Sequence, residues 1–400
     1  LFMRTQFLAD IPSTKERLQL TAFTLFCFLA FTYNLSEVPP YHADENFYVT
    51  SSRNMIDSND YITPTYHDKK RFAKPILFYW LVAASYQMLG INLFSARLVS
   101  TLFGALSILL IYILARRMFD SKTAIISALL LPGCYLHFQI SRWAITDMTL
   151  NFFTLLAFYF FTRGLQDESN RGTPYYLAYL SMGIGFMIKG PPALLIPGLV
   201  IGGFILTLRN WKKLSQLRIG HGVAILMAII LPWFITMLFM HGDEFKNHIL
   251  GAELGDRIAH DTPFSFYYFG VIIRYYLPWS LFFIVALAVR FRLISINPSE
   301  NLFERSYLSS LAEKLKIQCR KMAEKDNQPF LLCLLWIITP LLLFTLLRIE
   351  HSRYMLPVSP AVAMITAHFL SQLIKSPNGF QQKVFKIPFY LTGIFYFLIA

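Results

Sequence analysis

The stretch that decides the fold covers residues 42–48 and reads His-Ala-Asp-Glu-Asn-Phe-Tyr. It directly follows the first long apolar segment, at about 18–37, and further apolar segments follow it along the chain. A cationic stretch, 69–74, comes later in the same polar loop and reads Lys-Lys-Arg-Phe-Ala-Lys. Composition and topology decide whether this loop lies beside a membrane, and on which side.

The composition is that of a polytopic membrane protein. Of the 400 residues, 55% are hydrophobic and only 15% charged, whereas about a quarter of the residues of a soluble domain are charged. The net charge of +13 does not indicate nucleic-acid binding, because the basic residues fall in short loops between apolar segments, where topology explains them. The four cysteines show no metal-type spacing, so we expect neither a cysteine metal site nor a disulfide framework.

Hydropathy predicts an all-α polytopic bundle of about eleven or more transmembrane helices. The candidate spans are roughly 18–37, 92–114, 123–140, 148–164, 174–188, 191–208, 221–240, 268–289, 329–347, 354–374 and 387 onward. The first span has no small-residue cleavage site and is expected to remain as an anchor. The last is too short to span before the sequence stops at Ala400, so we expect the chain to be cut short there.

The distribution of Lys and Arg predicts the orientation. With a cytoplasmic N-terminus, 23 of the 36 basic residues lie in cytoplasmic loops, as the positive-inside rule requires. Residues 1–17 then form the cytoplasmic N-terminus, and 18–400 form one transmembrane domain with a basic cytoplasmic loop at 290–328. The outside segments are 38–91, 139–147, 189–190, 241–267 and 348–353, and in a bacterial cell they face the periplasm.

The first outside loop predicts two interfacial helices. Asp44 can cap a helix over 44–56 that carries an apolar stripe. A second helix, 75–89, is expected to begin with Pro75 as its first residue and is too short to span a membrane. Lys74 then stands at a helix start, where a cation is electrostatically unfavourable, so it either binds an anion or extends to lipid headgroups.

Three further outside turns each hold an ionisable residue that has two readings. Asp147 is either a functional acid at the membrane border or a helix cap that pairs with Arg142. Lys189, in a turn that is otherwise apolar, is either a phosphate-facing cation or an interfacial anchor. Arg353 either contributes to a phosphate clamp or pairs with Glu350.

The long outside loop at 241–267 contains Arg257 with several acids and three histidines. The spacing of these residues fits no recognised metal site. The residue pattern therefore leaves a bound metal open without supporting one.

Taken in order, these motifs resemble those of the bacterial aminoarabinose (lipid A) transferases and their relatives, the protein O-mannosyltransferases. Both are GT-C glycosyltransferases that use polyprenyl-phosphate sugars. No single motif is specific, but the ordered set is, and it covers roughly residues 35–370. The motifs are Asp44-Glu45 with Tyr48, Lys74-Pro75 with Phe78-Tyr79-Trp80-Leu81, Ala96-Arg97-Leu98, Leu114-Ala115-Arg116-Arg117, Thr146-Asp147, Lys189-Gly190-Pro191, Pro232-Trp233, Leu277-Pro278-Trp279-Ser280 and Arg353-Tyr354-Met355-Leu356-Pro357.

The resemblance implies a GT-C bundle in the bacterial inner membrane with its active site facing the periplasm. The implied reaction moves a sugar, with inversion, from an undecaprenyl-phosphate-linked donor to a hydroxyl or phosphate of lipid A, another glycolipid or a protein. Asp44 would be the catalytic base, with Glu45 and Asp147 as the other acids of the site. Substrate and phosphate binding would fall to Tyr48, Lys74, Lys189, Arg257, Arg353 and Tyr354.

Two positions depart from the aminoarabinose transferases. These typically carry Glu immediately before the Lys-Pro motif and Arg before the Tyr of the acidic motif, where this chain has Ala73 and Phe47. That Glu helps to hold a divalent metal, so the resemblance does not support a metal or another cofactor here. Two alternative functions remain: a flippase or transporter for polyprenyl or sugar lipids, which should bury charges in mid-span, and a non-catalytic lipid-binding relative.

Overall fold

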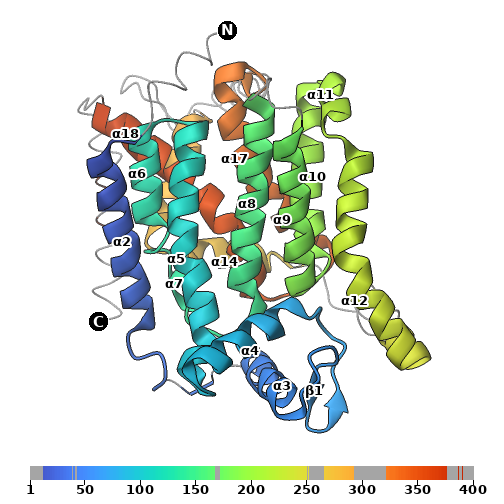
Figure 1. Cartoon of the computed structure of the whole chain (residues 1–400). Helices are drawn as coiled ribbons and strands as arrows, with labels where there is room; N and C mark the ends of the chain where they lie inside the picture. The colour runs from blue at the N-terminus through green and yellow to red at the C-terminus, as the bar shows by residue number, and fades with distance from the viewer. Residues whose placement is uncertain are drawn as a thin grey trace.

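The apolar segments form helices that run side by side, and the polar first loop packs across one end of them (Figure 1). The computed structural model describes residues 12–37, 39–40, 43–166, 172–249, 251, 265–291, 321–375, 386 and 390. The first loop contributes α3 (Ala43–Ser58), α4 (Leu77–Leu89) and an antiparallel hairpin of β1 (Thr65–Tyr66) and β2 (Lys69–Lys70), in which Thr65 pairs with Lys70. The other elements are α2 (Thr14–Thr32), α5 (Leu93–Met118), α6 (Ser121–Leu130), α7 (Tyr135–Ile140), α8 (Thr146–Gln166), α9 (Thr173–Lys189), α10 (Pro192–Leu208), α11 (Trp211–Gln216), α12 (Ile219–His248), α14 (Tyr267–Tyr275), α15 (Trp279–Arg290), η2 (Lys325–Asn327), α17 (Gln328–Leu346), η3 (Ser352–Val358) and α18 (Ser359–Lys375).

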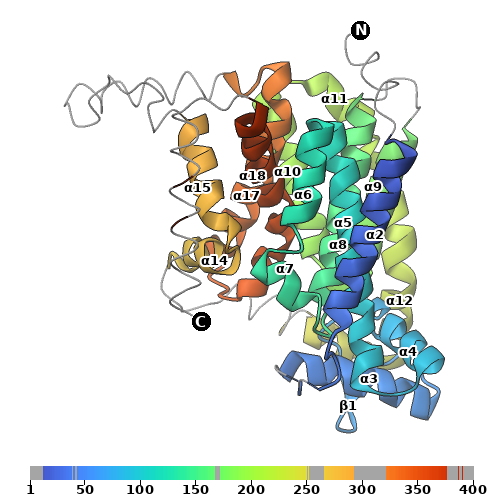
Figure 2. The same ribbon diagram turned by 90° about the vertical axis from the view of Figure 1, so that its left-hand side faces the viewer.

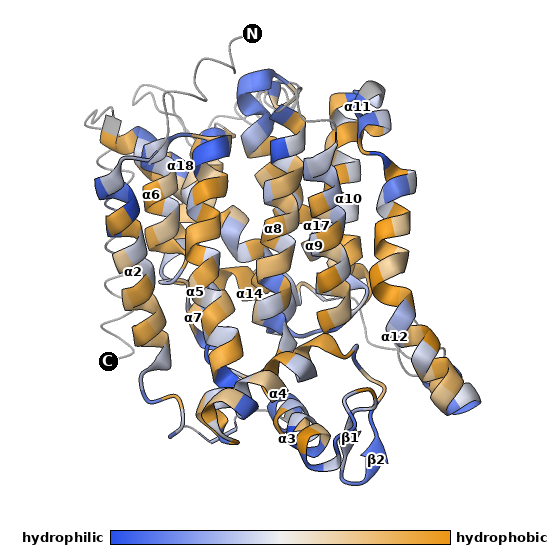
Figure 3. Cartoon of the chain, in the orientation of Figure 1, coloured by the Kyte–Doolittle hydropathy of each residue, from blue (hydrophilic) through white to orange (hydrophobic). Residues whose placement is uncertain are grey.

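The predicted all-α membrane architecture is confirmed, and every predicted span up to residue 374 coincides with a helix or a pair of helices. Within the described residues, four helical segments are long and apolar enough to cross a membrane, or five if the bent pair α14 and α15 counts as one span. Figure 3 shows apolar residues along the middle of the helices and hydrophilic residues towards both ends. The predicted span from 387 and most of the cytoplasmic loop 290–328 lie outside the described residues.

Three spans differ in detail from the prediction. The expected single helix at 268–289 is two helices bent by 113°, because Pro278 lies between them and cannot continue α14. The expected span 123–140 is divided into α6 and α7 by a turn. Helix α12 continues past the expected boundary at 240, with a break at Gly242 (φ 50°, ψ −126°), a conformation that glycine adopts without steric cost.

The two ends of the bundle differ. Helices α3 and α4 and the hairpin cover one end, whereas α11 lies at the other (Figure 2). Because successive helices alternate in direction, the start of α8, the end of α9 and the turn before η3 all come to the end that carries α3. The predicted outside turns at 139–147, 189–190 and 348–353 are thus brought together at one end.

Both interfacial helices exist, but each begins at a different residue from the one predicted. Helix α3 begins at Ala43, so Asp44 lies in the first turn and is not the cap. Helix α4 begins at Leu77 with Ile76 as its cap, so Pro75 precedes the helix instead of opening it. Phe78 is fully buried, and this anchors α4 in the core below α3.

Candidate functional site

Asp44 and Arg353 meet at the end of the bundle, although they are far apart in sequence. Asp44 lies in the first turn of α3, where the helix dipole favours an acid, and Arg353 is the second residue of η3. A guanidinium nitrogen of Arg353 forms an ion pair with Oδ2 of Asp44. The side chain of Asp44 keeps 29% of its surface exposed, so part of the carboxylate remains accessible.

Asp147 is the acid on which the cations converge. It is the second residue of α8, and its Oδ1 pairs with Nζ of Lys189, the last residue of α9. Nε of Arg353 lies 3.9 Å from the other oxygen of Asp147. The ring of Tyr354 completes the group, because Nζ of Lys189 lies 4.7 Å from its centroid. Arg353 therefore bridges Asp44 and Asp147.

Asp44, Asp147, Lys189 and Arg353 are here called the charged cluster, and their ion pairs differ from the two structural pairs that the sequence suggested. Asp147 pairs with Lys189, whereas Arg142 donates to the carbonyl of Tyr33. Arg353 pairs with the two aspartates, and Glu350 accepts a hydrogen bond from Ser265. Two carboxylates face two cations, so the cluster is close to electrically neutral.

Glu45 lies in a separate ion pair and not in the charged cluster. Its carboxylate accepts hydrogen bonds from Nε and Nη2 of Arg97 at 2.7 and 2.8 Å, and both side chains are only 1% exposed. The backbone N–H of Ala144 also donates to Glu45 at 2.8 Å. Arg97 further donates to the carbonyls of Leu35 and Pro39 at 2.7 and 3.3 Å. These contacts tie α3 to α5, to the end of α2 and to the turn before α8.

Tyr48 is buried beneath the site. It is 4% exposed, and its ring packs against Phe78 and Tyr79 with centroids 5.1 and 5.2 Å away. Burial raises the pKa of its hydroxyl well above the usual value, and the neighbouring Tyr79 and Asp44 act in the same direction. Tyr48 is thus a neutral side chain that packs α3 against α4.

Lys74 lies in the approach to α4 and is partly buried. Its ammonium donates to the carbonyl of Ala73 at 2.7 Å. The other predicted phosphate ligand, Arg257, lies outside the described residues. Among the residues that the structure does describe, no three His, Cys, Asp or Glu side chains come close enough together to hold a metal ion.

Sequence reasoning left two arginines of this end without a role. Arg97 is a charge in the apolar first part of α5, far from the two arginines of its last turn, and a charge in such a stretch indicates a buried partner. Arg71 lies in the cationic stretch, where nothing in the sequence separates it from Lys69 and Lys70. In the structure, its guanidinium carbon lies 3.7 Å from the centroid of the Phe47 ring.

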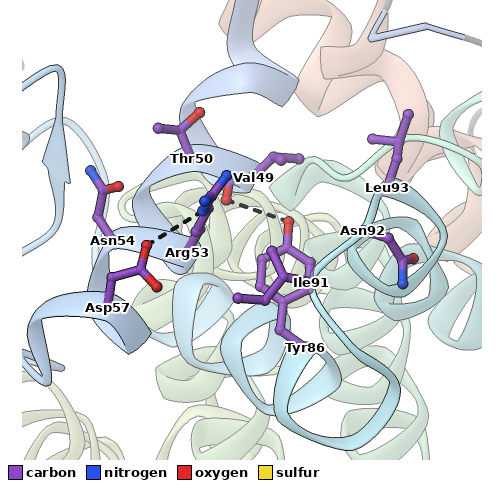
Figure 4. A pocket seen from close by; sticks show the side chains of 9 residues that line it. All are labelled: Val49, Thr50, Arg53, Asn54, Asp57, Tyr86, Ile91, Asn92 and Leu93. Carbon is purple, nitrogen blue, oxygen red and sulfur yellow. Dashed lines mark hydrogen bonds and ion pairs between the residues drawn. The ribbon is translucent and has the colours of Figure 1, made fainter.

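A pocket of about 460 Å³ lies elsewhere on α3 (Figure 4). By helical spacing, the α3 residues that line it are on the side away from Asp44 and Tyr48. An ion pair of 3.4 Å between Arg53 and Asp57 borders it. The lining residues are Val49, Thr50, Arg53, Asn54, Asp57, Tyr86, Ile91, Asn92 and Leu93, so the pocket does not include the charged cluster.

Comparison with known sequences agrees with the motifs. Residues 73–236 match the family model of the dolichyl-phosphate-mannose-protein mannosyltransferases. The chain is 27% identical over 372 residues to the undecaprenyl phosphate-alpha-4-amino-4-deoxy-L-arabinose arabinosyl transferase of Pseudomonas aeruginosa. The aligned region covers 90% of this chain and 60% of that protein. The chain thus spans less than two thirds of the length of this relative.

Solved structures show the same fold. ArnT from Cupriavidus metallidurans, solved with undecaprenyl phosphate, superposes with a TM-score of 0.73 at 24% identity, over 89% of this chain and 60% of that one. The oligosaccharyltransferase of Archaeoglobus fulgidus gives a TM-score of 0.52 at 13% identity, over 89% of this chain and 50% of that one. The chain therefore has the GT-C fold, and its sequence is similar to those of the bacterial aminoarabinose transferases and, over residues 73–236, of the protein mannosyltransferases.

Proposed function

We propose that the protein to which this chain belongs is a membrane glycosyltransferase that takes a sugar from an undecaprenyl-phosphate-linked donor. The observation that carries the proposal is the charged cluster, in which acids and cations from α3, α8, α9 and η3 meet at one end of the bundle. Two findings support it: a similar protein is named as an undecaprenyl phosphate-aminoarabinose transferase, and a solved structure of the same fold binds undecaprenyl phosphate.

The acceptor in this proposal is a lipid or a protein on the periplasmic side of a bacterial inner membrane, and the N-terminus is cytoplasmic. The distribution of charge supports this orientation. Arg116 and Arg117 end α5 at the bundle end opposite to α3, and basic residues favour the cytoplasmic side. In this orientation the charged cluster faces the periplasm.

The reaction replaces one bond of the anomeric carbon by another. The bond between this carbon and the donor phosphate breaks, and the oxygen of the acceptor attacks from the opposite side, so the configuration inverts. The polyprenyl phosphate leaves with the electron pair, and cations stabilise its developing charge; Lys74, Lys189 and Arg353 would supply them. Asp44 takes the proton of an acceptor hydroxyl, and a positioned base contributes about 10²–10⁴-fold to the rate.

Arg353 couples donor binding to the activation of Asp44. In the structure, the guanidinium of Arg353 pairs with an oxygen of Asp44 and approaches Asp147. A donor phosphate offers Arg353 a second anionic partner with the bidentate geometry that arginine prefers. As Arg353 turns to the phosphate, the carboxylate of Asp44 becomes available to the acceptor hydroxyl. The donor should therefore bind before the acceptor is activated.

Glu45 is a positioning residue in this scheme. Its two oxygens accept hydrogen bonds from Arg97 and from the N–H of Ala144, and in this proposal it does not contact substrate. The ion pair instead fixes the first turn of α3, and this turn also contains Asp44, the residue before Glu45.

Asp44→Asn is the variant that tests the proposal. The full-length protein is placed in liposomes with radiolabelled undecaprenyl-phosphate sugars and with lipid A or a protein acceptor. We expect Asp44→Asn to reduce transfer about 100-fold or more and to leave donor binding intact. Asp57→Asn is the matched control, because Asp57 lies on the same helix, is exposed and pairs only with Arg53 in the described structure. Full transfer by Asp44→Asn would refute the assignment of the base.

The same assay separates the alternative functions. A protein that moves the donor between leaflets and transfers no label is a flippase. A protein that binds undecaprenyl phosphate without either activity is a lipid-binding relative.

A further inference from the structure

Arg71 is held in place at the site by two aromatic residues. It follows β2 directly, and its Nε donates to the hydroxyl of Tyr79 at 3.3 Å. The guanidinium lies over the ring of Phe47, 3.7 Å from its centroid, and the ring of Tyr66 packs edge-on against Phe47 at 4.7 Å. A stacked guanidinium keeps its N–H donors in its own plane, so the stack leaves them directed sideways. This arrangement fixes the direction in which Arg71 can bind a ligand.

Arg71 has no acidic partner within the described part of the chain, whereas several cations of this end of the bundle do have one. Lys70 pairs with Glu244 at 2.6 Å, Arg53 with Asp57, and Lys189 and Arg353 with the aspartates of the charged cluster. Yet Arg71 is partly buried, where a charge without a partner is costly. A rigid, partly buried cation of this kind is suited to binding an anion that arrives from outside the chain.

The position of Arg71 connects it to Asp44. Phe47, its stacking partner, lies three residues after Asp44 in α3, and side chains three residues apart in a helix are neighbours on its surface. The buried hydroxyl of Tyr48 interacts electrostatically with both Asp44 and Arg71. Arg71 therefore lies along the same face of α3 as the proposed base, about one helical turn further on.

The charge balance of the charged cluster suggests what Arg71 contributes to the site. The charged cluster contains two acids and two cations, so it provides no surplus positive charge for a phosphate. Any phosphate bound there needs additional cations. Of the nearby residues that the structure describes, Arg71 is the one whose charge is both fixed by packing and not balanced by an acid.

We propose that Arg71, stacked on Phe47 and oriented by Tyr79, is an anion-binding residue of the substrate site that takes a phosphate oxygen. This inference rests on the proposed function. The phosphate belongs either to the polyprenyl donor or to a phosphorylated lipid acceptor, and both offer the same chemistry to a guanidinium.

The test measures binding, which requires no turnover. The full-length protein is titrated with undecaprenyl phosphate, with neutral undecaprenol and with lipid A that carries its phosphates. Arg71→Gln should weaken binding of one phosphate lipid about 10-fold or more, the usual scale for a hydrogen bond to a charged group, and should leave undecaprenol binding unchanged. Lys70→Gln, which alters the adjacent cation, should change neither. A loss confined to undecaprenyl phosphate identifies the donor as the source, and a loss confined to lipid A identifies the acceptor.

Two further variants make the test independent of folding defects. Arg71→Lys keeps the charge but loses the planar fork, so it should fold normally and bind the phosphate lipid with intermediate affinity. Adding Phe47→Arg to Arg71→Gln returns a guanidinium to the same face of α3 and should restore part of the binding. If wild type binds the phosphate lipids and Arg71→Gln binds them equally well, the inference is overturned while the proposed function stands. If wild type binds neither phosphate lipid, the proposed function fails, and this subsite fails with it.

Discussion

Removing either partner of the ion pair between Glu45 and Arg97 should strongly destabilise the protein. Both side chains are 1% exposed, so removing one partner leaves the other charge buried and unpaired. Such a loss costs about 3–5 kcal/mol. Arg97→Met also leaves the carbonyls of Leu35 and Pro39 without this donor, which places it at the upper end of the range. Glu45→Met leaves a buried guanidinium and the N–H of Ala144 without their shared acceptor.

The double variant should be less damaging than either single one. Methionine fills much of the space of both side chains, and no charge remains buried. The cost that remains is that of the backbone groups left without a partner, about 1–3 kcal/mol. The coupling between the two sites should therefore be at least about 3 kcal/mol.

Denaturation of the four purified proteins in the same detergent measures this cycle, and the transfer assay provides a second readout. We expect the double variant to recover stability but not full transfer, because the first turn of α3 would no longer be fixed below Asp44. Additive single effects, or single effects below about 1 kcal/mol, would refute a buried and coupled pair.

Two further predictions concern the donor and the packing of the bundle. Lys74→Ala should weaken binding of undecaprenyl phosphate about 10-fold, whereas the exposed Lys69→Ala should not; equal affinity in a direct titration would remove Lys74 from the phosphate site. Gly104→Ala should destabilise the protein by about 1–3 kcal/mol, because its Cβ would lie only 2.8 Å from Cβ of the buried Ser141. Gly202→Ala on α10 is the control, since a Cβ there meets nothing within 4 Å; the melting temperatures of both variants in detergent decide the comparison.

The positions of the helices and the meeting of the outside turns could be predicted from sequence, because apolar length and alternating direction depend on local composition. Topology alone predicts that Asp147, Lys189 and Arg353 lie at one face, and the structure brings all three together. Proline shows the limit of this reasoning. Pro197 and Pro340 lie inside helices that continue, whereas Pro278 separates two helices. Whether neighbouring groups compensate for the lost hydrogen bond depends on packing that no local pattern encodes.

The roles of neighbouring acids could not be predicted from sequence. Asp44 and Glu45 are adjacent and chemically alike, yet successive positions of a helix point in directions about 100° apart. One carboxylate therefore meets Arg353 and the other meets Arg97. Arg71 cannot be told from Lys70 by sequence for a similar reason, because the two differ only in their partners. Arg71 lies over the ring of Phe47, whereas Lys70 pairs with Glu244.

The near-neutral charged cluster has a consequence for how a substrate reaches it. Charges that cancel within a few ångströms create little field beyond the screening length of about 8 Å at physiological salt, so the cluster does not draw soluble phosphate from the surrounding water. A lipid-linked phosphate does not depend on such attraction. Its hydrocarbon chain confines it to the plane of the bilayer, where its local concentration beside the helices is high. We therefore expect the membrane to select among phosphate compounds before Arg353 does, so that abundant water-soluble sugar phosphates compete poorly.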